Sequence, residues 1–221
     1  PVPVEPYMNS LKEAIIYFGE NKNARFRFVT KYNDVDTLLN IKHNGHTEIR
    51  FSLNTPAIIS QYEHATASSE KRIEASIKVA KTGYPTGYLI APVFIYDNWK
   101  EEYRNLLLYL KGKLPENLKY PITFEIISHR YTAVAKNRIQ QIFPETKLEM
   151  NEEDRKFKYG QFGYGKYLYP PESINNIKVP GGRRSAEPIA ETVFFHLGWY
   201  AAIAAVSLVR KFGTQTMLIA R

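Results

Sequence analysis

The stretch from Arg25 to Asn54 limits the fold most, because a strand, a short helix and a second strand follow one another there within about thirty residues. Residues 25–30 alternate polar and apolar side chains at the period of a β-strand, and residues 47–51 do so again. Between them, apolar residues at helical spacing predict a short helix over residues 33–41. This spacing is typical of a βαβ unit, so we expect the two strands to lie parallel in one sheet.

The alternation of helices and strands continues along the chain. Further helices are predicted to begin near Ser10, Thr55, Ser68, Asp97 and Ala133. Two more strands are predicted over residues 85–93 and 121–127, and the first of these is nearly all apolar, as in a strand buried on both faces. The pattern up to Phe143 therefore predicts an α/β fold with a parallel sheet, either a barrel or an open sheet.

Polar residues follow three of the predicted strands at the end where parallel α/β sheets bind ligands. Lys31 follows the first strand, Ser52 ends the second and His129 follows the fourth. Loops at the carboxyl ends of parallel strands converge on one opening, so we expect these side chains to share it. The plainer interpretations stay open: Lys31 as a solvated loop lysine, Ser52 as the cap of the next helix and His129 as a structural histidine.

Composition limits the size and the chemistry of the protein. A chain of 221 residues, 44% of them hydrophobic, is long enough for one sizeable core. The net charge of +8 favours polyanionic partners such as nucleic acid. The sequence has no cysteine, which excludes disulfides, thiolate zinc sites, a cysteine nucleophile and a cysteine-held iron–sulfur cluster within this chain.

Residues 155–169 interleave basic residues, glycines and aromatic residues. Glycines between alternating aromatics suit a tight β-hairpin. Aromatic rings beside lysines suit stacking on nucleic-acid bases and neutralising phosphates. The alternative is an ordinary exposed hairpin whose rings pack on the rest of the fold.

The C-terminal part of the chain has a different composition. Residues 180–184 form a glycine- and arginine-rich link, and residues 192–209 contain no charged side chain. The uncharged run is at the short limit for a membrane span, so we expect a buried or misplaced helix in preference to a transmembrane one, and no membrane partner. His43 and His46 flank a predicted Asn-Gly turn, and without a third ligand at helical spacing we expect no metal site there.

Several short segments, taken together, closely resemble the spore photoproduct lyase family. They are residues 27–32, 43–45, 50–54, 91–92, 124–130 and 163–167. The resemblance implies a radical S-adenosyl-L-methionine (AdoMet) enzyme with a partial (β/α) barrel of the TIM type. It also implies the family's activity, which reverses the thymine dimer of ultraviolet-irradiated spore DNA to two thymines, in the cytoplasm of a bacterial spore. In that family a [4Fe–4S] cluster cleaves AdoMet, and the 5′-deoxyadenosyl radical abstracts a hydrogen atom from the lesion.

The resemblance assigns roles to particular residues. Lys31 and Ser52 match positions that hold AdoMet through its carboxylate and ribose, and Ala91 matches a backbone contact near the adenine. The hairpin matches one that wedges into damaged DNA near the lesion. The expected DNA-binding residues are His129, Arg130, Lys158, Gln161, Phe162, Tyr164 and Lys166. Gln161 stands at a position where the family can carry an arginine.

The chain also departs from the family pattern. The cluster-binding CxxxCxxC motif, its neighbouring tyrosines and the hydrogen-donating cysteine would precede Ser10, so we expect no catalytic residue in this chain. The expected organisation is an unmatched leader over 1–9, a partial barrel over 10–150, a DNA-contacting hairpin region over 151–172 and an unmatched tail over 173–221.

We expect the chain to be the C-terminal part of such a lyase, with foreign or frame-shifted sequence at both ends, and to be inactive alone. The alternatives are a cluster-free module that binds damaged DNA and a non-functional fragment. No protein partner is expected.

Overall fold

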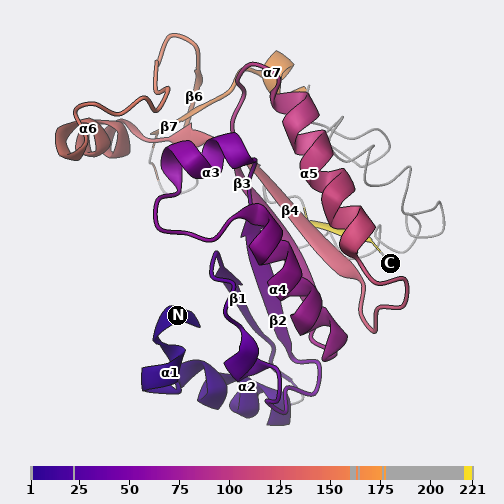
Figure 1. Cartoon of the computed structure of the whole chain (residues 1–221). Coiled ribbons are helices and arrows are strands. Elements are labelled where there is room, and N and C mark those ends of the chain that lie inside the picture. The colour runs from indigo at the N-terminus through magenta and orange to yellow at the C-terminus, as the bar shows by residue number, and fades with distance from the viewer. Residues whose placement is uncertain are drawn as a thin grey trace.

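The computed structural model of the chain describes residues 2–21, 23–159, 163, 165–175, 177 and 217–220. Its main sheet holds four parallel strands in sequence order, followed by one antiparallel strand (Figure 1). The strands are β1 (Phe26–Thr30), β2 (Thr47–Leu53), β3 (Thr86–Val93), β4 (Ile122–Ser128) and β8 (Met217–Ala220). The predicted parallel α/β fold is therefore confirmed, and the unbroken strand order is that of a barrel segment.

Helices precede, connect and follow the strands, and some of them cover one face of the main sheet. They are η1 (Val2–Val4), α1 (Glu5–Met8), α2 (Ser10–Glu20), η2 (Asp36–Leu38), α3 (Pro56–Tyr62), α4 (Ser69–Lys81), α5 (Trp99–Lys113), α6 (Ala133–Ile142) and α7 (Pro171–Asn175). In Figure 1, α4 and α5 lie side by side along the same face of the sheet. None of the helices in the described residues is long and apolar enough to cross a membrane, and the predicted helix over 192–209 lies outside those residues.

The helix predicted between the first two strands was wrong in detail. The link predicted as a helix over 33–41 contains only the single turn η2, because Val35 and Leu38, both fully buried, are spaced by one 3₁₀ turn and anchor the short link there. Helix α2 contains Gly19 and ends at Glu20. A Cβ at Gly19 would come within 2.8 Å of the Lys42 carbonyl oxygen, so glycine allows a close approach of two backbone segments there.

The start of α2 is capped from outside the helix. Asn9 makes no side-chain cap bond; instead the two carboxylate oxygens of Glu5 accept from the backbone N–H groups of Leu11 and Lys12, each at 2.7 Å. Glu5 is only 2% exposed. Its negative charge also lies at the positive end of the helix dipole, where it stabilises the helix.

Strand β2 separates an apolar face from a charged one. Ile49, Phe51 and Leu53 are fully buried in the core with residues of α4 such as Ile73 and Val79. The intervening side chains belong to the opposite face, because successive residues of a strand alternate between faces. They are Glu48, Arg50 and Ser52.

Arg50 links three strands on that opposite face. Its guanidinium donates to Glu48 at 3.0 Å and to Glu125 on β4, while Glu48 also pairs with Arg27 on β1 at 2.7 Å. Burial raises the pKa of Glu48, but hydrogen bonds from Thr123 and Arg50 and the charges of both arginines bring it below its usual value. Arg50 is 2% exposed, so the charges hold β1, β2 and β4 together where little water competes.

The antiparallel hairpin predicted from the aromatic run is present in the described residues. Strands β6 (Lys156–Tyr159) and β7 (Gly165–Leu168) pair with each other, and β5 (Arg130–Tyr131) pairs with the other edge of β7. Figure 1 shows this small sheet beyond the end of the main one, beside α6. The short strand β5, which follows β4 almost directly, was not predicted from the sequence.

His129 joins the hairpin to the main sheet. Its ring, 6% exposed, stacks on Phe94 with centroids 4.6 Å apart, and its backbone N–H donates to Val93. Arg155, which precedes β6, donates to the His129 carbonyl at 3.2 Å and places its guanidinium 3.6 Å from the ring centroid of Tyr169. Burial and the charge of Arg155 lower the pKa of His129 to about 4, so the ring is neutral.

Replacing Arg50 with Met is expected to lower the free energy of unfolding by about 3 kcal/mol, because Glu48 and Glu125, each only 14% exposed, would lose their shared cation. Urea denaturation measures this. Lys78→Met is the matched control, since Lys78 and its partner Asp36 are both more than half exposed and the midpoint should not move. Equal effects of the two substitutions would contradict the role given to Arg50.

His129 is expected to make stability depend on pH. Its pKa of about 4 in the folded chain lies below the ordinary histidine value of 6.5, so the unfolded chain binds the proton first. Stability is therefore full above pH 6.5 and falls as the pH drops toward 4, by about 2 kcal/mol between pH 7 and pH 5. His129→Phe should flatten this slope in urea titrations, whereas the exposed His64→Gln should leave it, and an unchanged slope in His129→Phe would refute the assignment.

Candidate functional site

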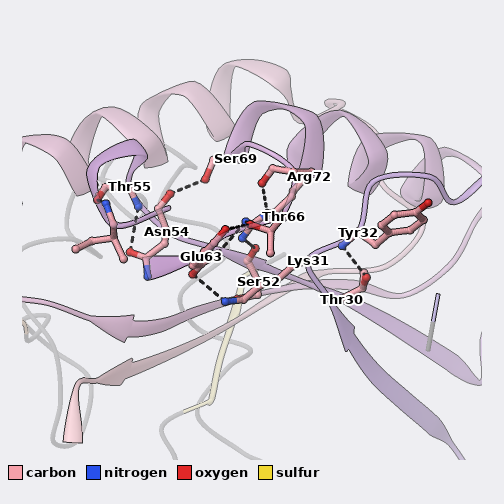
Figure 2. Close-up of polar contacts among 12 residues, drawn as sticks. Thr30, Lys31, Tyr32, Ser52, Asn54, Thr55, Glu63, Thr66, Ser69 and Arg72 are labelled. Carbon is pink, nitrogen blue, oxygen red and sulfur yellow. Dashed lines mark hydrogen bonds and ion pairs between the residues drawn. The ribbon is translucent and has the colours of Figure 1, made fainter. Parts of the chain in front are cut away.

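Lys31 and Ser52 lie level with each other at the carboxyl ends of neighbouring strands. Thr30 is paired with Phe51 in the parallel register of β1 and β2, so the residue after each stands at the same height. Figure 2 shows the two side chains close together at this edge of the sheet. Ser52 is 2% exposed, while the Lys31 side chain is 38% exposed. The expectation that the two residues share one opening thus agrees with the strand register.

A carboxylate lies between Lys31 and a buried arginine. One oxygen of Glu63 is 2.9 Å from Lys31 Nζ, and the other is 2.8 Å from Arg72 Nη2. Both oxygens are buried, and both contacts are close ion pairs although neither has hydrogen-bond geometry. The three charges sum to +1, so the group has one positive charge left for an anion.

Arg72 also holds the backbone beneath Ser52. Its Nη1 donates to the Ser52 carbonyl at 3.0 Å, its Nε donates to the Ala67 carbonyl at 2.8 Å, and its Nη2 donates to Thr66 Oγ1 at 2.7 Å (Figure 2). The side chain is fully buried. The guanidinium therefore connects the end of β2, the loop before α4 and Glu63 in one network.

Asn54 fixes the end of β2 against the end of β3. Its amide nitrogen donates to the Pro92 carbonyl at 2.9 Å, and its amide oxygen accepts from the hydroxyl of Tyr103 at 2.6 Å. Ser69 donates to the Asn54 carbonyl from the start of α4. Ala91, half-buried, precedes Pro92, so its backbone lies beside this corner and at the same end of the sheet as Ser52.

The two faces of the hairpin differ in chemistry. One face carries Phe157 and Tyr159, whose rings are 5.0 Å apart, and Tyr167, whose ring is 5.2 Å from Phe157. The other face carries Lys158 and Lys166, which are direct cross-strand partners. Like charges at directly opposed positions destabilise a ladder, and within the described residues neither ammonium has a carboxylate in ion-pair range.

Gly165 makes the aromatic face of the hairpin possible. A Cβ at this position would lie 2.2 Å from the ring of Phe157, so any other residue would displace that ring. Gln161, Phe162 and Tyr164, which were predicted to contact DNA, lie outside the described residues. The described strands thus place Lys158 and Lys166 next to the segment that holds the other three.

The structure places His129 beneath the hairpin, and its contact with DNA stays a prediction. The ring is buried and neutral and lies against Arg155 at the base of the hairpin, which agrees with the structural alternative. Arg130, the next residue, is exposed at the start of β5. Arg130 therefore stays available to a polyanion, while His129 supports the position of the hairpin.

The two histidines that flank the Asn-Gly turn have structural roles. His43 stacks on Tyr84 with ring centroids 3.6 Å apart, and His46 Nδ1 donates to the Phe18 carbonyl at 2.9 Å. Asn44 and Gly45 both have positive φ, as the predicted turn requires. Among the described residues, no three potential ligands from His, Asp and Glu gather closely enough to hold a metal ion.

Sequence analysis did not identify Glu63 and Arg72. Arg72 had a usable signal, since it lies on the buried side of α4 with Ile73 and Ser76, and an arginine at such a position needs a buried partner. Glu63 had none, because it follows α3 as the C-cap residue outside any periodic pattern. Its contact with Lys31 spans thirty-two residues of sequence and exists only in the folded chain.

Comparisons with known proteins identify the family. The family model described as "Spore photoproduct lyase" matches residues 1–191, including the segments 1–9 and 173–191 that sequence analysis placed outside the resemblance. Spore photoproduct lyase of Clostridium acetobutylicum is 54% identical over 178 residues, covering 80% of this chain and 52% of the relative. The Bacillus subtilis relative is 42% identical over 193 residues, covering 87% and 55%. The chain thus spans about half the length of these curated relatives.

Solved structures agree with the sequence match. A spore photoproduct lyase variant with bound AdoMet and dinucleoside spore photoproduct matches with a TM-score of 0.74 at 41% identity, covering 78% of this chain and 51% of that one. A second variant gives 0.75 at 37% identity, covering 86% and 53%. The fold is accordingly the α/β partial barrel of these enzymes. With a family match over most of its length, this chain belongs to the spore photoproduct lyase family.

Proposed function

We propose that this chain supplies the AdoMet-binding and lesion-binding half of a spore photoproduct lyase, which reverses spore photoproduct to two thymines. The observation that carries the proposal is the register that brings Lys31 and Ser52 level at the carboxyl ends of β1 and β2. In parallel α/β folds this edge is where ligands bind. A relative of known structure holds AdoMet and the dinucleoside lesion, which supports both ligands here.

The residues at this edge fit AdoMet chemically. Lys31 offers an ammonium to the methionyl carboxylate, and the remaining +1 charge of the group formed with Glu63 and Arg72 matches that single negative charge. Ser52 offers a hydroxyl to the ribose, and the backbone at Ala91 offers hydrogen-bonding groups to the adenine. When bound in an active member of the family, AdoMet supplies the 5′-deoxyadenosyl radical.

The chain does not fit a [4Fe–4S] cluster. Such clusters are held by cysteine thiolates, and none of the 221 residues is cysteine. We therefore assign this chain no step of the chemistry that the cluster performs in the family. Its contribution is to bind and orient AdoMet and the lesion, and the expectation that the chain alone is inactive stays a prediction.

We assign the hairpin to DNA. Lysines on one face suit phosphates, and exposed aromatics on the other suit bases that have left the stack. Phe157 and Tyr159 are 45% and 72% exposed, which is unusual for rings that serve only packing. Extrusion of a damaged dimer costs less than flipping a sound pair, so a wedge beside the lesion has a physical basis.

A second candidate function rests on the same hairpin. A chain with a basic, aromatic hairpin and no cysteine would also suit a module that recognises damaged DNA without chemistry. Lesion-dependent DNA binding without any AdoMet affinity would favour this candidate. For both functions we propose the interior of a bacterial spore, where the lesion forms, as the location.

Replacing Lys31 with Met is expected to weaken AdoMet binding about tenfold, because the ligand carboxylate loses its charged partner. Isothermal titration of the purified chain with AdoMet measures the effect. Lys78→Met, which removes another lysine from an ion pair on the surface of α4, is the matched control and should bind as the unaltered chain does. No measurable binding to the unaltered chain, or equal binding by both variants, would remove the basis of the cofactor assignment.

Replacing Lys158 and Lys166 together with Met is expected to weaken binding to lesion-containing duplex DNA. If both contact phosphates, the slope of log K against log salt should become less steep by about 1.8, which is about 0.9 for each contact. Fluorescence anisotropy at several salt concentrations measures the slope. The fold should tolerate the change, since it removes two opposed like charges.

The control for the hairpin substitution is Lys81→Met, at the exposed C-terminal end of α4. Figure 1 shows that end of α4 at the opposite end of the main sheet from the hairpin. The salt slope of this variant should match that of the unaltered chain. A slope that falls equally in both variants would mean that general charge, and not the hairpin, attracts the DNA.

A further inference from the structure

The ion pairs at the mouth of the sheet run from a buried residue to an accessible one. The side chain of Arg72 is 0% exposed, that of Glu63 is 5% exposed and that of Lys31 is 38% exposed. Arg72 is fixed by three further hydrogen bonds, to Ser52, Ala67 and Thr66. The ion pairs therefore connect a rigid, buried guanidinium to a carboxylate, and that carboxylate to an ammonium that can reach a ligand (Figure 2).

Glu63 is also held by its own backbone. Its N–H donates to the Ile59 carbonyl at the end of α3, and its carbonyl accepts from Thr66 Oγ1 at 2.7 Å. Thr66 thus touches both Glu63 and Arg72. A carboxylate fixed at its backbone and at one oxygen presents the other oxygen in one direction, so it limits where the Lys31 ammonium lies.

We propose that Glu63 and Arg72 are positioning residues for AdoMet, which direct the Lys31 ammonium at the ligand carboxylate and hold the backbone of Ser52 level with it. The inference rests on the proposed function and deepens it, because it states how the two predicted contacts are kept together. Neither residue is assigned a direct contact with AdoMet. They act through Lys31 and Ser52.

The net charge of Lys31, Glu63 and Arg72 predicts which part of AdoMet these residues recognise. Two cations and one anion leave one positive charge, which one carboxylate neutralises. Decarboxylated AdoMet retains the adenosine and the sulfonium but lacks the carboxylate. The ratio of the affinities for AdoMet and for this analogue therefore reports on Lys31, whereas general damage to the site lowers both affinities together.

The test is Glu63→Asp, which keeps the charge but withdraws the carboxylate by one methylene from Lys31. The unaltered chain is expected to prefer AdoMet over the decarboxylated analogue about tenfold, and Glu63→Asp is expected to reduce that preference to about threefold or less. Isothermal titration measures both affinities. The matched control is Glu101→Asp, an exposed glutamate paired with Arg104 on α5, which should keep the full preference.

A double-mutant cycle and a second, more conservative substitution make the test more specific. In a Lys31→Met background, Glu63→Asp should no longer alter the preference, because the group through which it acts is gone. Thr66→Val keeps every charge but removes the hydroxyl shared by Glu63 and Arg72, and it should lower the preference about twofold. This variant serves as the test should Glu63→Asp fail to fold, which a thermal melt would reveal.

The outcomes separate the two proposals. An unaltered chain that binds both ligands equally would overturn the assignment of Lys31 to the carboxylate and this inference with it. An unaltered chain that prefers AdoMet, with the preference retained in Glu63→Asp and Thr66→Val, would overturn only the positioning role. A parallel loss of both affinities at a constant ratio would likewise overturn it, because it would reveal a purely structural role.

Discussion

The buried charge of Arg50 is the constraint on which the sheet depends. A guanidinium that is 2% exposed must meet carboxylates, and it meets Glu48 within its own strand and Glu125 two strands away. Arg27 and Thr123 complete the surroundings of Glu48. Because these contacts join β1, β2 and β4, a shift in strand register would separate charges inside the protein, which is costly. The register that brings Lys31 and Ser52 level is thereby fixed.

The sheet therefore has two charged groups with different net charges. The group around Arg50, nearer the amino ends of the strands, has two cations and two anions and is neutral. The group around Arg72, at the carboxyl ends, has two cations and one anion. An anionic ligand is attracted to the second group and not to the first. The difference directs a carboxylate to the edge where parallel sheets bind ligands.

The sequence predicted what depends on local periodicity. Residues 47–51 alternate clearly, and the observed strand Thr47–Leu53 differs only by its last two residues. The helix over 33–41 failed because its apolar spacing fits one buried turn as well as a helix. Glu63 escaped notice because its role depends on Lys31 and Arg72, which only folding brings together. Glu5 likewise caps α2 from before the helix, so no capping residue at its start could reveal it.

The arrangement of the hairpin has a further consequence. Its ladder places Lys158 and Lys166 on one side and Phe157, Tyr159 and Tyr167 on the other. The hairpin consequently has one basic face and one aromatic face, and the two are not interchangeable. A polymer with charges along one edge and flat rings along the other matches these two faces in one orientation. In the reversed orientation its charges meet the rings and its rings meet the lysines. The alternation of a few residues therefore determines the orientation in which such a polymer binds the hairpin.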